Sequence, residues 1–207
     1  MTLGQVACDE KSNEITAIPE LLQLLSLKGA TVTIDAMGCQ KEIAAQIREQ
    51  KGHYLLQVKG NQPQLEEQLV QHFEQCLESD FAGVEHRRSE TTETGHGRTE
   101  TRIVDVVALP EEFAPRADWK DLRTLVVVTS ERVVDGKSSW ESRCHTACGQ
   151  CRSVLPRGAL TSESSHSLPC VRLASISGRV REAIIVVPER PALRSGASRR
   201  GRSQAEA

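Results

Sequence analysis

The chain has 207 residues and a formal net charge of −2, and its hydrophobic and aromatic fractions, 38% and 3%, are low for a globular protein. This length suits one domain of ordinary size, and no apolar run approaches the roughly 20 residues that a membrane span needs. The opening residues MTLGQVACDE lack the basic start and apolar stretch of a secretory signal peptide, so we expect a cytoplasmic protein that contacts no membrane.

The first part of the chain alternates between strand and helix patterns. A β-α-β-α-β order favours a sheet that is at least partly parallel, with right-handed crossovers. The sequence therefore predicts an α/β fold with flanking helices. Strands are expected at residues 3–8, 31–35 and 53–58, and helices at residues 17–27 and 40–51.

The first expected helix has recognisable ends. Thr16 is placed to cap its start, and Pro19 falls in its first turn, where a missing N–H does little harm. Lys28 and Gly29 then supply a cation and a glycine, which are typical of a helix C-terminus.

After a polar loop, residues 64–78 form a strongly helical pattern. The chain then changes character, because alternating polar and apolar residues around tight turns are typical of antiparallel hairpins. Hairpin strands are expected at residues 84–94 with 98–108, and at residues 123–129 with 137–143, around the turns Gly95-His96-Gly97 and Asp135-Gly136.

One carboxylate stands where α/β sheets gather their chemistry. The strand TVTID ends on Asp35, and the small residues AMGC lead into the next helix. The carboxyl ends of strands in open sheets line ligand sites, and a carboxylate there is a ligand for a hard metal ion. Asp35 is therefore the candidate catalytic and metal-ligating residue, although one carboxylate alone does not make a metal site.

Three motifs in order carry a family resemblance: TIDAMGCQ around Asp35, a strand ending in KGNQ, and GHGRTETR with the later VVVTSER. With this spacing, residues 3–143 resemble the catalytic domain of DDE transposases of the insertion-sequence, H-repeat-associated type. The resemblance implies a ribonuclease H-like mixed sheet, in which the predicted hairpins form an insertion. It also implies two Mg²⁺ ions held by two Asp and one Glu, which promote DNA phosphodiester hydrolysis and strand transfer.

Only one member of the family's carboxylate trio matches this chain. Asp35 corresponds to the second Asp, whereas the family's first Asp lies upstream of LGQV, where this chain begins. Asp135-Gly136-Lys137 repeats the letters of the family's first-Asp segment but lies after VVVTSER, and no glutamate beyond residue 143 follows a His-Trp pair. We therefore expect an incomplete ribonuclease H-like domain that binds Mg²⁺ weakly and neither cuts nor joins DNA by itself.

Five further residues are candidates for DNA contact. Lys59, Asn61 and Gln62 follow a strand, where they are expected either to meet phosphate oxygens or to form a solvated loop that starts the next helix. His96 and Arg98 lie at a hairpin turn, where they either approach DNA or merely decorate the turn. The resemblance favours a functional interpretation of His96 and Arg98 without assigning a role.

The composition changes sharply after about residue 143. Residues 1–150 carry 16 Lys and Arg against 24 Asp and Glu, whereas residues 151–207 carry 10 Arg against 4 Glu. The basic segment also lacks Phe, Tyr and Trp, so it has no aromatic side chains to fill a core. We interpret residues 144–207 as an irregular Arg/Ser-rich tail that is either translated out of frame, the explanation we favour, or disordered, and residues 1–143 as the partial catalytic domain.

Several other residues favour a structural interpretation. Cys8 and Cys39 are expected to be buried thiols, and Trp119 and Trp140 to be packing residues. The Cys and His residues within 144–151 are too closely spaced for the two separated ligand pairs of a structural zinc site.

Three functional hypotheses remain open. The first is a transposase remnant with reduced or lost activity, whose DNA partners are insertion-sequence ends. The second is a non-catalytic DNA-binding or regulatory fragment that competes with or joins full-length transposase, although the acidic balance of residues 1–150 argues against strong non-specific DNA affinity. The third is an unrelated phosphatase or nuclease, which would need further carboxylates near Asp35.

Overall fold

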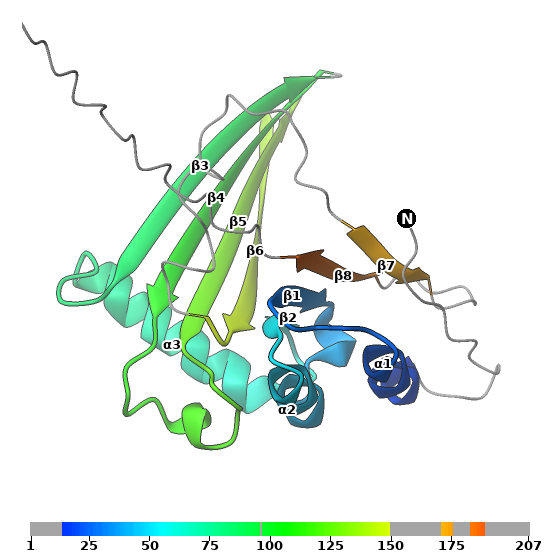
Figure 1. Ribbon diagram of the computed structural model, residues 1–207. Helices are drawn as coiled ribbons and strands as arrows, with labels where there is room; N and C mark the ends of the chain where they lie inside the picture. The colour runs from blue at the N-terminus through cyan, green and yellow to red at the C-terminus, as the bar shows by residue number, and fades with distance from the viewer. Residues whose placement is uncertain (1–13, 96, 150–170, 176–182, 189–207) are drawn as a thin grey trace, which may run out of the picture.

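The structure, a computed structural model, describes residues 14–95, 97–149, 171–175 and 183–188. Its centre is one mixed sheet of eight strands in the order β3-β4-β5-β6-β2-β1-β8-β7 (Figure 1). The strands are β1 Ala30–Ile34, β2 His53–Val58, β3 His86–Gly95, β4 Arg98–Ala108, β5 Thr124–Val134, β6 Lys137–Ala147, β7 Val171–Ser175 and β8 Ala183–Pro188. The helices are α1 Glu14–Gln23, α2 Lys41–Glu49 and α3 Pro63–Glu78, with 3₁₀ turns η1 Ala36–Gly38 and η2 Ala114–Ala117.

The parallel part of the sheet lies at its centre. β1 and β2 are parallel and are joined through α2, and the other strand pairs in the sheet are antiparallel. The α/β class and the mixed sheet expected from the sequence are confirmed. The strand expected at residues 3–8 lies outside the described residues, and no helix within the described ranges is long and apolar enough to cross a membrane.

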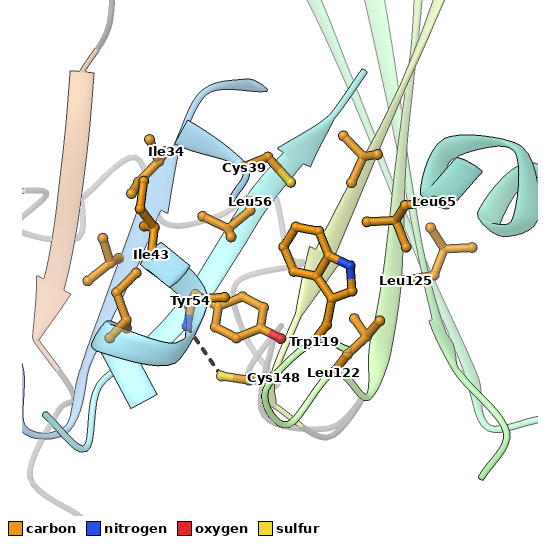
Figure 2. Close-up of a cluster of buried hydrophobic side chains, with 14 of the residues drawn as sticks. Ile34, Cys39, Ile43, Tyr54, Leu56, Leu65, Trp119, Leu122, Leu125 and Cys148 are labelled. Atoms are coloured by element: carbon orange, nitrogen blue, oxygen red, sulfur yellow. Dashed lines mark hydrogen bonds between the residues drawn. The ribbon is translucent and has the colours of Figure 1, made fainter. Parts of the chain in front are cut away.

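One face of the sheet carries the main hydrophobic core (Figure 2). Side chains of a strand alternate between faces, so Leu56 and Val58 of β2 share a face with Ile34 of β1. The buried residues of α1, α2 and α3 pack against this face, and we call it the helix face. Its largest fully buried side chains are Tyr54, Ile18, Leu21, Leu22, Leu27, Ile43, Ile47, Leu56, Leu69, Leu122 and Leu125.

The loop between β4 and β5 completes this core. Trp119 is 2% exposed, which confirms that it is a packing residue (Figure 2). The Tyr54 hydroxyl donates a hydrogen bond of 2.9 Å to the carbonyl of Lys120, and the Tyr54 backbone N–H lies 3.2 Å from Cys148 Sγ. These contacts hold the loop and the end of β6 against β2.

Both predicted hairpins are confirmed, and the second one is longer than expected. The turn between β5 and β6 is tight because Asp135 and Gly136 both adopt positive φ, as two-residue hairpin turns require. β6 continues past residue 143 to Ala147 and pairs there with β2, and Cys148 is buried in the core. The division at residues 143 and 144 stays a prediction, but the expectation of an irregular tail is wrong where the described residues form the end of β6, β7 and β8.

The four strands β3 to β6 extend beyond the parallel part of the sheet (Figure 1). Val58, the last residue of β2, pairs with Cys144, so the preceding seven residues of β6 project past the carboxyl end of β2. Seven residues span roughly 23 Å of strand. We call this projecting part the blade, and it consists of residues 89–95, 98–104, 128–134 and 137–143.

Two local expectations are wrong. The helix α1 includes Thr16 in its interior rather than at its cap, holds Pro19 beyond its first turn, and ends at Gln23. Gly29 instead uses positive φ to enter β1, and its N–H donates to the carbonyl of Lys51 at 3.0 Å. The expectation that Trp140 is a packing residue is also wrong, since this residue is 61% exposed on the blade.

Candidate functional site

Asp35 leaves β1 at its carboxyl end and begins a short 3₁₀ turn. Its Oδ1 accepts a hydrogen bond from the backbone N–H of Ala36, and its side chain is exposed. Ile34 is buried on the helix face, so the alternation of the extended backbone directs Asp35 to the opposite face of the sheet. We call that opposite face the Asp35 face.

The loop after β2 is tied to the turn after Asp35. Asn61 Nδ2 donates to the carbonyl of Ala36, and Gln62 Nε2 donates to the carbonyl of Cys39 at 3.0 Å. Gln62 stands at the N-cap of α3 but makes no side-chain capping bond, so its amide serves the neighbouring turn instead. The two amides therefore brace the segment that presents Asp35.

The turn itself depends on small and buried residues. A Cβ atom at Gly38 would collide with the side chain of Ile34 and lie 3.0 Å from Ile18 Cδ1. Cys39 is fully buried, and burial raises the pKa of its thiol to about 12. The small residues expected between strand and helix are therefore required by packing, and the expectation of a buried Cys39 is confirmed.

A histidine shares the Asp35 face. His145 lies directly across from Gln57 on β2. Burial lowers the pKa of His145, and this effect outweighs a backbone hydrogen bond with Val126 and the charge of Asp35, which both raise the pKa. Its Nδ1 is buried and makes no hydrogen bond to the described residues. The environment thus favours a neutral imidazole beside the sheet edge.

The donor set around Asp35 does not fit a site for two metal ions. Among the described residues, no group of three or more His, Cys, Asp or Glu side chains is placed to hold a metal ion. Cys148 Sγ is directed into the core toward Tyr54 and His53, and Cys151 lies outside the described residues.

The structure brings four of the six predicted site residues to one edge. Asp35, Asn61 and Gln62 meet there, and Lys59 follows the end of β2. Arg98 begins β4 at the blade tip, where it pairs with Val134, roughly 20 Å along the strands from the end of β2. His96 lies outside the described residues.

Two charged residues at this edge were missed from the sequence. Arg143 donates two hydrogen bonds of 2.9 and 3.0 Å to Glu141, and this pairing lowers the pKa of Glu141, with a smaller contribution from Lys59. Both residues lie on β6, whose pairing with β2 joins segments about 90 residues apart. No local feature of the sequence predicts that pairing.

Comparisons with known proteins agree on one family. A family model described as the transposase DDE domain matches residues 1–137. The chain is 43% identical over 135 residues to the H repeat-associated putative transposase YhhI of Escherichia coli (strain K12), a match that covers 65% of this chain and 35% of that protein. It is 45% identical over 113 residues to the H repeat-associated putative transposase YbfD of the same organism, covering 55% of this chain and 44% of that protein.

A further relative is an uncharacterised protein in the dhlA 3′ region of Xanthobacter autotrophicus. It is 42% identical over 151 residues, which cover 71% of this chain and 50% of that protein. The chain therefore spans between about a third and a half of the curated relatives it matches. No solved structure matches it.

Proposed function

Because the chain belongs to the DDE transposase family, and within it to the H-repeat-associated type, we propose that it is part of a ribonuclease H-like catalytic domain that acts on DNA. The observation that carries this proposal is Asp35, an exposed carboxylate at the carboxyl end of a central parallel strand. Open α/β sheets bind ligands at this edge. The chain matches only part of the length of these relatives. The activity of the whole protein is therefore part of the proposal.

The reaction proposed for the complete domain is hydrolysis of a DNA phosphodiester followed by strand transfer, supported by Mg²⁺. In this chain Asp35 would be one ligand, and Asn61 and Gln62 hold the turn that presents it. Mg²⁺ keeps most of its waters when a single carboxylate contacts it, so binding is weak. The chain by itself is therefore an inactive part of the enzyme.

A strand-transfer assay tests the inactivity. The purified chain is incubated with insertion-sequence-end DNA, a target plasmid and Mg²⁺ or Mn²⁺, and joined products are counted. We expect none above the level of the Asp35→Asn variant. Products that depend on Asp35 would contradict the proposed inactivity while supporting the family role of this carboxylate.

A metal titration tests the ligand role of Asp35 separately from activity. Millimolar Mn²⁺ should broaden the NMR signals of the Asp35 and Ala36 amides, because a paramagnetic ion relaxes nearby nuclei. The Asp35→Asn variant should lose this broadening, and Asp118→Asn, an exposed carboxylate paired with Lys41, serves as the control. Equal broadening with Asp35→Asn would exclude Asp35 as a ligand.

A second candidate function is a non-catalytic fragment that binds DNA and competes with or joins full-length transposase. The observation that favours it is the combination of one carboxylate with an extended blade that carries several arginines. Addition of this chain to an active full-length relative separates the two functions. A dose-dependent loss of transposition indicates the regulatory function, and an unchanged rate excludes it.

A further inference from the structure

The two faces of the blade differ in charge. Directly paired residues on neighbouring strands share a face, and residues two apart on one strand do so as well. The helix face of the blade therefore carries only Glu90 and Glu131 as charged residues. The Asp35 face carries the cations Arg98, Arg102, Arg132, Lys137 and Arg143 against the carboxylates Glu93, Glu100 and Glu141.

The arginines on the Asp35 face form a row. Directly paired residues form one level of the sheet. On one face, successive levels are two residues, or roughly 6.6 Å, apart along the strands. Starting beside the end of β2, the four consecutive levels each hold one arginine, so the row runs roughly 20 Å from the Asp35 edge to the blade tip. The row, in order, is Arg143, Arg102, Arg132 and Arg98.

Neighbouring carboxylates hold three of these four guanidinium groups in place without covering them. Glu100 lies 3.0 Å from Arg102 and 3.7 Å from Arg132, and Glu141 pairs with Arg143. The arginine side chains in these pairs remain 51 to 53% exposed. Each guanidinium has five N–H donors, so further acceptors can bind while one carboxylate is engaged.

A hollow lies within the row. It has a volume of about 220 Å³ and opens beside Trp140, at the part of β6 that pairs with β5 alone among the described strands. On the Asp35 face its lining combines one guanidinium, two hydroxyls and two carboxylates. The guanidinium and the hydroxyls are donors that phosphate oxygens accept from, and the carboxylate of Glu100 holds the guanidinium in place. The lining residues are Glu100, Ser130, Arg132, Ser139, Trp140 and Glu141.

We propose that the arginine row binds the phosphate backbone of double-stranded DNA and leads it along the blade to the Asp35 edge. This inference rests on the proposed function. The net charge of residues 1–150 is negative, but the blade separates its charges by face and leaves the Asp35 face positive. A row of about 20 Å matches roughly six base pairs of a duplex, whose phosphates repeat every 3.4 Å on each strand.

Two double variants with the same change in net charge test the proposal. E100Q/E141Q removes carboxylates that compete with phosphate inside the row, and E90Q/E131Q removes the two carboxylates on the opposite face of the same blade. Fluorescence anisotropy with a labelled 30-base-pair duplex measures the Kd over a salt series. We expect E100Q/E141Q to bind about fivefold more tightly than the unaltered chain and E90Q/E131Q to bind within twofold of it.

A triple variant tests the opposite change, the removal of positive charge from the row. R102A/R132A/R143A should reduce the slope of log Kd against log salt by about 3, since each lost phosphate contact removes about 0.9. K28A/K120A/R123A, which removes three exposed cations outside the blade, should leave that slope unchanged. The glutamine variants keep side chains of the same size on the blade, so they keep the test valid if the triple variant is unstable.

The outcomes separate the two proposals. If the chain binds DNA and both glutamine variants bind it equally, the proposal that the arginine row binds DNA is wrong, while the proposed action on DNA stands. If the unaltered chain binds no duplex even at 25 mM salt, the row is overturned together with the proposed DNA contact. Face-specific tightening supports the row.

Discussion

At the scale of single residues, the side chains around Asp35 serve the shape of its turn. Asn61 and Gln62 follow β2 as expected, yet their amide groups donate to carbonyls of the turn after β1. A phosphate contact would compete with those bonds. The structure therefore favours a positioning role for the two amides, and leaves Lys59 as the exposed cation of the KGNQ motif.

The Asn61 contact predicts a measurable loss of stability. Asn61→Ala removes the donor to the Ala36 carbonyl, and one partly buried hydrogen bond contributes about 1 kcal/mol. Urea unfolding should show a loss of this size, with Gln64→Ala, a substitution at the exposed second residue of α3, as the control. An unchanged midpoint for Asn61→Ala would show that its amide does not brace the turn.

The buried thiol of Cys39 predicts a pH dependence. Its pKa is about 12 in the folded chain and about 8.5 in an unfolded one, so between these values only the folded state keeps the proton. The free energy of unfolding should therefore fall above pH 9, by about 1.4 kcal/mol per pH unit from this group. In Cys39→Ala this fall should be smaller by that amount, and equal slopes in the two chains would contradict the prediction.

At the scale of elements, hydrophobic periodicity identified the helices and strands well. The strand at residues 53–58 has the expected bounds, and the expected helix at residues 64–78 corresponds to α3, whose buried residues are Leu65, Leu69 and Cys76. A helix period of 3.6 residues marks the face that packs on a sheet, and this signal is local. The position of Asp35 after β1 could be predicted for the same reason.

Long-range pairing could not be predicted in this way. Arg102, Arg132 and Arg143 lie on three strands, and only their register brings them to one face. The same limit explains the exposure of Trp140. At this residue β6 pairs with β5 alone among the described strands, so its side chain lies on the blade and not in the core. The bracing by Asn61 likewise depends on the parallel pairing of β1 with β2.

The packing of α3 predicts a sharp contrast between adjacent residues. Leu69 is fully buried against the sheet, whereas Val70 is 38% exposed. Leu69→Ala should cost about 3 kcal/mol, because it removes buried methyl groups and leaves a cavity, and Val70→Ala should cost less than about 0.5 kcal/mol. Chemical denaturation of the two variants measures this contrast, and similar losses would show that α3 does not dock as described.

At the scale of the whole molecule, stability is unevenly distributed along the sheet. β5 has a hydrogen-bonded neighbour on both sides throughout, but its first four residues are buried and the rest are half-buried or exposed. Amide exchange depends on local opening, which is easier where few side chains are buried. The core and the blade therefore differ in stability although one ladder joins them.

Hydrogen exchange along β5 tests this gradient. The amides of Leu125 and Val127 should exchange at least about a hundredfold more slowly than those of Arg132 and Val133. Both pairs lie on the same strand and in the same ladder, so strand position is their main difference. Uniform protection along β5 would show that the blade is as stable as the core.

The ladder along β6 has a mechanical consequence. This strand pairs with β5 over its full length and with β2 at its last four residues, so no flexible linker separates the projecting strands from the parallel strands. The blade is therefore a continuation of the sheet whose edge presents Asp35, not a separate module. Any molecule held along its length is thereby oriented relative to that carboxylate before it reaches it.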